Sequence, residues 1–464
     1  MGSPLRAPGF GARPLIGAPY LEFDRRREAL RTNLWFVPTL EVLAAVGLFA
    51  VTYVADRAVY RGALTIPEWV IGGTPDAARQ ILTAIAAAII TVVGVVFSIT
   101  IVALTLASTQ FGPRMLRNFI RDRGTQVTLG TFVASFVYAI AALVSVSADF
   151  VPHIATTVAI ASLVVDLAVL IYFINHIAMA IQLPNVIAGI AAEVSIAVDT
   201  NRHIVSPGPT RGPSPDELLT RLTESGGQVR VAGSGYLQYI RHEKLVRMAA
   251  AEDAVVYLPF RPGHFLTAGQ IVAHVWPAEA ADRIAENFAR GQVAGPTRTL
   301  TQDISFGIDQ IVEIALRALS PAVNDTFTAM TCIDWLGDCL SRIAASWNPD
   351  PVRRDRDGYV RVIATQVTYE RLVQRAFEKI RQAGRGMPAV MIRQLDVLTE
   401  IADRTEDPQR LRVLIDQADM IETSARESIT DEPDRADVLR RYRTLRSRVD
   451  RNPADAATRP ESAG

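Results

Sequence analysis

The chain has 464 residues, 49% of them apolar and 21% charged, and its 48 basic side chains balance its 48 acidic ones. This balance excludes a generic nucleic-acid-binding protein, which needs an excess of Lys and Arg, and the composition excludes a wholly disordered chain. Two cysteines are too few for a disulfide scaffold. Only 14 of the 96 charges fall between residues 34 and 183. The sequence therefore predicts a membrane domain at 34–183, followed by a larger soluble region.

Four apolar stretches follow an N-terminal flank, residues 1–33, which lacks the apolar core and cleavage pattern of a signal peptide. Each stretch is long enough to cross a hydrocarbon core of about 30 Å as a helix. They cover about 34–55, the uncharged residues 80–113, 125–148 and 154–183. A helix over the second stretch would be about 51 Å long. We therefore expect that helix either to tilt and project from the membrane or to break near Gly94.

Arginines close to the predicted spans indicate the orientation of the protein, because positively charged loops stay in the cytoplasm. They cluster before the first span and between the second and third spans: Arg25, Arg26, Arg27, Arg31, Arg114, Arg117, Arg121 and Arg123. Both termini are therefore predicted to be cytoplasmic. Arg114, Arg117 and Arg121 would share one helical face that could contact anionic lipids. Ordinary topology signalling explains them as well.

Polar residues recur along the second span. Thr91, Ser98 and Thr105 lie seven positions apart and so share one helical face, which Ser108, Thr109 and Gln110 continue. In an oligomer this stripe could line a water-filled path. The alternative is that the small hydroxyl residues only allow close helix packing.

Two carboxylates, Glu41 and Asp166, fall inside predicted spans, where ionisable groups are costly and commonly functional. Helical rise places both at a similar depth, so adjacent helices would bring them together into a cation or proton site. His176, with Asn175, lies nearer the inner end of the fourth span and could continue such a path. Alternatively, each acid is protonated or bonded to Ser or Thr and only fixes helix contacts.

The soluble region is expected to begin with a helical linker, residues 184–228, which includes a helix at 216–223. Short strands then crowd into residues 229–277, and five of them predict a small closed β-barrel or sandwich. The predicted strands are 229–231, 235–240, 245–249, 255–259 and 270–275.

Residues 278–449 predict a helical cytoplasmic domain with one strand at 359–364, and residues 450–464 a disordered tail. An apolar stripe with helical spacing marks one helix: Ile308, Ile311, Val312, Ala315 and Leu319. Asp325, preceded by Asn324, is expected to cap the next helix, on which Cys332 and Cys339 share a buried face. We expect Asp303, Asn324 and Asp325 to lie at subunit or interdomain contacts.

Three long runs of the sequence resemble one bacterial family of predicted membrane proteins, the domain-of-unknown-function family 2254. These runs are SITIVALTLASTQFGPRMLRNFIRDRGTQVTLGTFVASFVY, GYLQYI with RPGHFL, and QDISFGIDQIVEIALRALSPAVNDTFTAMTCIDWL. The resemblance extends over nearly the whole chain, but the family name implies no activity. Where family members commonly carry Gly and Pro in the last run, this chain has Ala322 and Thr326. That departure argues against an unusual backbone at this turn.

The overall expectation is an α-helical membrane protein with four transmembrane helices, joined to a cytoplasmic α+β region that has a small β-barrel and a helical C-terminal part. The leading functional hypothesis is a homo-oligomeric ion channel or transporter with a cytoplasmic gating or vestibule domain. Its partners would be membrane lipids, further copies of the chain and an ion or small-molecule permeant, and not nucleic acid. The alternative is a membrane-tethered sensor or scaffold. An enzyme ranks third, because no phosphate loop, metal cluster or nucleophile–base pair is evident, and no cofactor is expected.

Overall fold

The computed structural model of the chain describes residues 35–65, 70–71, 73–111, 122–202, 210–288 and 292–450. These residues form two compact units. An α+β unit comprises the described residues of 206–298 and 350–366, and a helical unit comprises those of 31–205, 299–349 and 367–464. The arginines of the N-terminal flank and Arg114, Arg117 and Arg121 lie outside the described residues. So does nearly all of the expected tail, residues 450–464.

Five helices of the helical unit are long and apolar enough to cross a membrane. They are α2 (Phe36–Tyr60), α3 (Pro75–Phe111), α5 (Arg123–Ser145), α6 (His153–Ala180) and α7 (Leu183–Arg202). The first four coincide with the predicted spans. The helix α3 runs through Gly94 without interruption, so the alternative of a break there is wrong.

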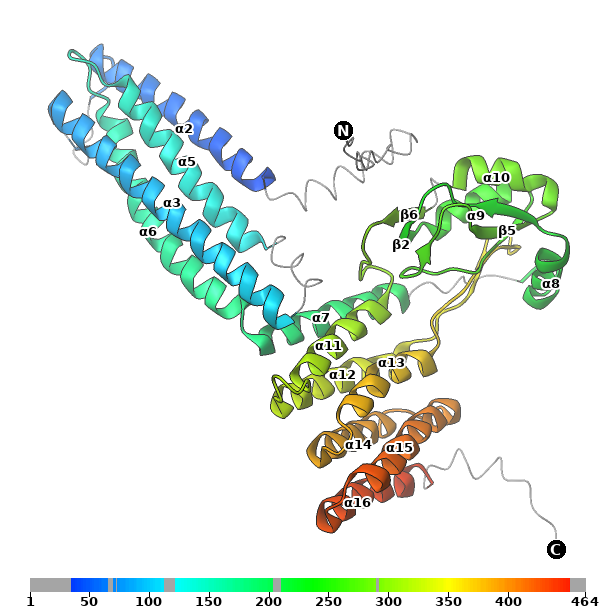
Figure 1. Cartoon of the computed structure of the whole chain (residues 1–464). Coiled ribbons are helices and arrows are strands. Elements are labelled where there is room, and N and C mark those ends of the chain that lie inside the picture. The colour runs from blue at the N-terminus through cyan, green and yellow to red at the C-terminus, as the bar shows by residue number, and fades with distance from the viewer. Residues whose placement is uncertain are drawn as a thin grey trace, which may run out of the picture. The chain divides into compact units, whose positions relative to one another are not determined.

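The helices α2, α3, α5 and α6 lie side by side, and α5 packs against the other three (Figure 1). Their core contains large apolar side chains that are almost completely buried, such as Leu82, Phe132 and Phe173. Other large apolar side chains, such as Leu43 and Leu167, point outward and are exposed. An apolar exterior of this kind is suited to lipid and not to water.

The structure has one more candidate span than the four expected, because α7 is also long and apolar enough to cross a membrane. The predicted helical linker, residues 184–228, includes nearly all of these residues. In the structure, Ile187, Ile190 and Val194 of α7 are buried in one core with α11 (Ile304–Ala318) and α12 (Thr326–Ser346). The apolar face of α7 is thus covered by helices that carry charged residues on their other sides.

The remaining helices of this unit extend the same core. They are α13 (Tyr369–Ala383), α14 (Pro388–Ala402), α15 (Pro408–Ser428) and α16 (Glu432–Val449). The predicted stripe of α11 is confirmed, since all five of its members are buried. Cys332 and Cys339 are buried and free of disulfides, and burial raises the pKa of both thiols to about 12. They are core residues that stay protonated at neutral pH.

The α+β unit contains two open sheets, so the predicted closed barrel is wrong. The larger sheet has the strand order β1-β5-β3-β8-β7, and the smaller has the order β4-β2-β6. The strands are β1 (Gly227–Arg230), β2 (Gly235–Ile240), β3 (Val255–Leu258), β4 (Phe265–Leu266), β5 (Ile271–Trp276), β6 (Gln292–Gly295), β7 (Val352–Arg354) and β8 (Val360–Ala364). The predicted strand at 359–364 is confirmed as β8, which pairs in parallel with β3.

Helices cover both faces of the larger sheet, which leaves no reason for it to close on itself. One face packs on α8 (Pro215–Ser225), which confirms the helix expected there. The other packs on α9 (His242–Ala251) and α10 (Ala281–Phe288), with a short 3-10 turn (Ala278–Ala280) before α10. Successive residues of β3 lie on opposite faces of the sheet, since Val255 packs with α8 and Val256 packs with α9.

The strand predicted at 245–249 is wrong, because these residues lie in α9. Leu245 and Ala249, four positions apart, are its buried residues. That spacing belongs to a helix, and the run of Met and Ala beside it favours a helix as well.

The turn before α12 has the predicted cap. The Asp325 carboxylate accepts hydrogen bonds from the Thr328 backbone N–H at 3.0 Å and from the Thr328 hydroxyl at 2.6 Å. Asn324 has a φ of 51°, in the left-handed region that Asn tolerates better than most residues. The turn therefore does need an unusual backbone, but at Asn324 and not at the positions where this chain departs from the family pattern.

We expect Asp325→Ala to lower the free energy of unfolding by about 1 kcal/mol at neutral pH, the usual cost of a lost cap. The hydrogen bonds from Thr328 hold the pKa of Asp325 below its usual value. The contribution is therefore complete above the unfolded pKa of about 4 and disappears as pH falls through the folded value. Unfolding of both proteins in detergent between pH 7 and pH 3 measures this difference. An equal difference at every pH would contradict the explanation.

The position of the C-terminus separates four spans from five. If α7 belongs to the soluble core, reporters fused after His153 should face outward and reporters at the C-terminus should face the cytoplasm. A phosphatase active only outside the cytoplasm and a fluorescent protein that matures only inside it would measure this. An outward C-terminus, with His153 also outward, would make α7 a fifth span.

Candidate functional site

Hydrogen-bonding side chains occur at several depths among the membrane helices. At one end of the bundle, the Asp56 carboxylate on α2 accepts hydrogen bonds from the backbone N–H groups of Ile154 and Ala155, at 2.8 and 2.9 Å. These N–H groups belong to the first turn of α6, whose own cap residue, Pro152, makes no side-chain bond. Asp56 is only 3% exposed. It therefore caps α6 from a neighbouring helix.

The next contact joins α2 to α5. The hydroxyls of Thr52 and Tyr138 lie 2.9 Å apart in a hydrogen bond, and the Phe49 ring meets the Tyr138 ring edge-on. Tyr138 is buried. An aromatic body with one bonded hydroxyl suits a helix interface inside a membrane.

Asp166 on α6 points to α5, where the Ser135 hydroxyl donates to its Oδ1 at 3.0 Å. Asp166 is only 3% exposed. Its Oδ2 is buried and has no hydrogen-bond partner among the described residues. The carboxyl group is therefore only half satisfied by the protein.

Glu41 on α2 lies against Gly130 of α5. A Cβ atom at position 130 would sit 2.1 Å from Glu41 Oε2 and 2.9 Å from the Pro38 Cα. Glycine is thus required for the two helices to approach this closely. Oε2 of Glu41 is buried, again with no hydrogen-bond partner in the described part of the chain.

His176 on α6 contacts the start of α5. Its Nε2 lies 2.8 Å from Oδ2 of Asp122, which caps α5 and also accepts from the Thr125 N–H. The Tyr172 ring stacks on the imidazole with 5.5 Å between ring centres. His176 thus has a carboxylate partner at the N-terminal end of α5.

The structure does not bring Glu41 and Asp166 together into one site, because their contacts on α5 are with Gly130 and Ser135. These two positions are about 8 Å apart along the helix axis, and Asp122 lies about 12 Å beyond Gly130. The three ionisable groups predicted for a path therefore form a spaced series, each in contact with α5.

The polar stripe of α3 faces away from this series. Thr91, Ser98 and Thr105 are exposed, and Ser98 lies about 180° around the helix from the buried Ile89. The hydroxyls of Thr91 and Thr105 donate to carbonyls of their own helix at 2.8 Å. The stripe therefore lines no path within one subunit. The side chains of Ser108, Thr109 and Gln110 lie outside the described part.

The other predicted site residues lie elsewhere. Asp303 is buried just before α11, whereas Asn324 is exposed and Asp325 caps α12. Whether they contact another subunit stays a prediction. Within the residues that the structure describes, no group of three or more His, Cys, Asp or Glu side chains could hold a metal ion.

Sequence reasoning missed Asp56, Ser135 and Asp122 as members of the network. Asp56 lies just beyond the predicted end of the first span, at about residue 55, whereas α2 continues to Tyr60. The role of Ser135 as the partner of Asp166 has no local signal in the sequence. Asp122 could have been found, since an Asp three residues before Thr125 fits a helix cap.

We expect Gly130→Ala to lower the free energy of unfolding by about 1–3 kcal/mol, because the added methyl group overlaps Glu41 and Pro38. Gly47→Ala is the matched control, since Gly47 is exposed in the middle of α2 and a Cβ atom there meets nothing within 4 Å. Both changes bring the same gain in helix propensity, so their difference isolates the contact. Melting temperatures in detergent measure it, and equal values would contradict the close approach of α2 and α5.

Comparison with known proteins agrees with the membrane helices. The family model described as "Predicted membrane protein (DUF2254)" matches residues 31–400. Uncharacterized proteins of Mycobacterium bovis and Mycobacterium tuberculosis are each 32% identical to the chain over 428 residues, which cover 88% of this chain and 79% of theirs. No solved structure matches the chain. The chain therefore belongs to the DUF2254 family of predicted membrane proteins.

Proposed function

We propose that the protein is a homo-oligomeric channel or transporter for protons or small cations, and that the path in each subunit follows α5. The observation that supports this most is the half-satisfied carboxyl group of Asp166. Ser135 bonds one of its oxygens, while the other is buried with no partner among the described residues. A proton or a cation would complete its bonding.

The energetic argument rests on the apolar surroundings. A charged carboxylate near the middle of a membrane helix costs about 2.5–3.5 kcal/mol on insertion scales. Phe173 and Ala159, on the same helix, are almost fully buried in apolar contacts, so the bundle offers little else to offset this cost. Asp166 therefore favours either the protonated state or a bound cation, and an exchange between the two states is the elementary step of transport.

The series along α5 would provide further stations. Glu41 has a buried oxygen with no partner in the described part, and His176 with Asp122 stands at the N-terminal end of α5. Gaps of about 8 and 12 Å between contacts on α5 are too long for direct proton transfer. The proposal therefore requires water molecules between the stations when the path is open.

The outer face of α3 supports the oligomer. Small residues recur on it at alternating intervals of three and four, and all of them are exposed: Ala84, Ala87, Thr91, Gly94 and Ser98. Small residues at this spacing allow membrane helices to approach closely. In the proposal a second copy of the chain packs here, so the stripe forms a contact between subunits and not the path.

The proposal places the protein in a bacterial plasma membrane with both termini in the cytoplasm, where the α+β unit and the soluble helices would form a gate or vestibule. The protein transports and does not catalyse a reaction. The alternative, a membrane-tethered sensor or scaffold, is favoured by one observation. The α+β unit is compact and has its own apolar core, as expected of a domain that binds a ligand or protein by itself.

Flux through reconstituted vesicles tests the proposal. We expect wild-type protein to carry protons or small cations, and Asp166→Asn to lower the flux by about tenfold or more, equivalent to about 1.4 kcal/mol in the barrier. Thr91→Val, which removes a hydroxyl from the outer face of α3, is the control and should leave the flux of each oligomer unchanged. A pH-sensitive dye inside the vesicles and potassium or sodium gradients provide the measurement.

Vesicles that conduct no better than empty ones, across a range of pH, voltage and tension, would contradict transport. Equal flux in the wild type and Asp166→Asn would contradict the path along α5. In the first case the sensor or scaffold becomes the leading function.

A further inference from the structure

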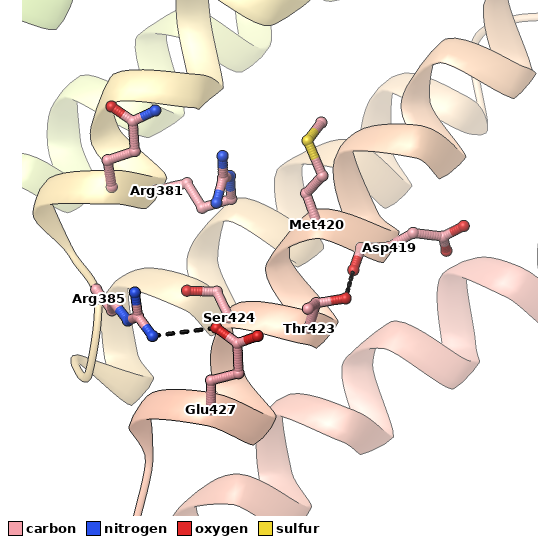
Figure 2. Close-up of a pocket in the computed structure, with 8 residues that line it drawn as sticks. Arg381, Arg385, Asp419, Met420, Thr423, Ser424 and Glu427 are labelled. Carbon is pink, nitrogen blue, oxygen red and sulfur yellow. Dashed lines mark hydrogen bonds and ion pairs between the residues drawn. The ribbon is translucent and has the colours of Figure 1, made fainter.

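A groove with a cavity volume of about 360 Å³ lies in the helical unit between the C-terminal turn of α13 and the helix α15. Figure 2 shows Arg381 of α13 and Arg385 of the turn that follows it on one side, with Met420, Thr423 and Ser424 of α15 on the other. The groove is remote in sequence from the membrane helices. Nothing in the proposed transport path uses it.

The charged side chains that line the groove differ in whether they already have a bonding partner. Arg385 forms an ion pair with Glu427 at 3.0 Å, and the Asp419 carboxylate accepts a hydrogen bond from the Tyr442 hydroxyl at 2.8 Å. Both carboxylates of the lining are thus occupied by other groups. Arg381 differs from them, since its Nε is buried and has no hydrogen-bond partner among the described residues.

The wall opposite Arg381 supplies one hydroxyl donor. The Thr423 hydroxyl already donates to the Asp419 carbonyl at 2.9 Å, so its single proton is engaged. Ser424, one position further along α15 and 6% exposed, is the other hydroxyl in the lining. Met420 adds an apolar contact beside them. The groove therefore combines a guanidinium group, a hydroxyl and a thioether.

We propose that this groove binds a small molecule through a carboxylate or phosphate group. The guanidinium of Arg381 can give two parallel hydrogen bonds to the two oxygens of such a group. The two terminal Nη groups provide these bonds, because the buried Nε is out of reach of a ligand in the groove. Ser424 donates to the same group, and the remainder of the ligand lies against Met420.

The position of the groove in the sequence indicates which relatives of this protein would have the same site. The Arg381 wall falls within residues 31–400, which the family model matches, whereas the whole α15 wall lies beyond them. The site therefore combines a family element with one from outside the matched region. We expect it to be a property of this chain and of relatives that retain α15.

Calorimetric titration of the full-length protein in neutral detergent tests the proposal, with inorganic phosphate and succinate as probes. In Arg381→Ala the Kd should rise by about tenfold or more, as expected when a charge-assisted bidentate contact is lost. Arg381→Lys keeps the positive charge but lacks the two parallel N–H donors, so it should lose less affinity than Arg381→Ala. Ser424→Ala should also weaken binding, whereas Thr423→Val should not, because the Thr423 proton is already engaged. Arg412→Ala, an exposed change on α15 outside the lining, is the control.

Two sources of phosphate are distinguished by repeating the titration in micelles that contain phosphatidylglycerol or phosphatidylcholine. Competition by phosphatidylglycerol alone would identify a lipid headgroup, and its absence would identify a soluble anion. If Arg381→Ala does not give a single species in gel filtration, the comparison of Arg381→Lys with Ser424→Ala and Thr423→Val decides. The proposal is wrong if neither probe and neither lipid binds, or if binding is the same in the Arg381 and Ser424 variants as in the wild type.

Discussion

A hydroxyl or carboxyl group inside a bilayer has no bulk water to bond, so it must find its partner within the protein. Most such partners in this bundle come from α5. Tyr138 bonds Thr52, Ser135 bonds Asp166, and Gly130 leaves the space in which Glu41 lies. Since α5 packs on α2, α3 and α6, these contacts determine how the four helices face one another. The same contacts hold the ionisable groups that the proposed path would use.

The helix α3 satisfies its polar groups differently. Leu82 and Ile89 bury its apolar face against the bundle, while Thr91 and Thr105 turn outward and bond carbonyls of their own helix. Such self-satisfied hydroxyls tolerate either lipid or a second helix. The hydroxyls of Thr91 and Thr105 therefore lie on the surface of the bundle, whereas those of Ser135 and Tyr138 bond partners inside it.

Sequence order and spatial order differ most in the α+β unit. The larger sheet receives β7 and β8 from residues 350–366, after a stretch of chain, 299–349, that belongs to the other unit. The parallel pairing of Val256 in β3 with Val362 in β8 spans more than a hundred residues. Consecutive strands neighbour each other most often, so their spacing in the sequence favours a closed barrel and gives no sign of this distant pairing.

The sequence by itself determined the features that depend on neighbouring residues. Apolar length located the membrane helices, three-to-four spacing marked the buried face of α11, and a cap residue marked the start of α12 at Asp325. Backbone hydrogen bonding and side-chain periodicity are local, so they are visible in a short window of sequence.

Only the tertiary structure decided which distant groups meet. It separated Glu41 from Asp166, paired Asp166 with Ser135, used Asp56 to cap α6 and placed the α7 face in a core with α11 and α12. The groove at Arg381 likewise lies between α13 and α15, and no local pattern in the sequence predicts that these two helices are in contact. The physical reason is that helix rotation and neighbour choice are set by the packing of whole faces, to which each residue contributes only a small part.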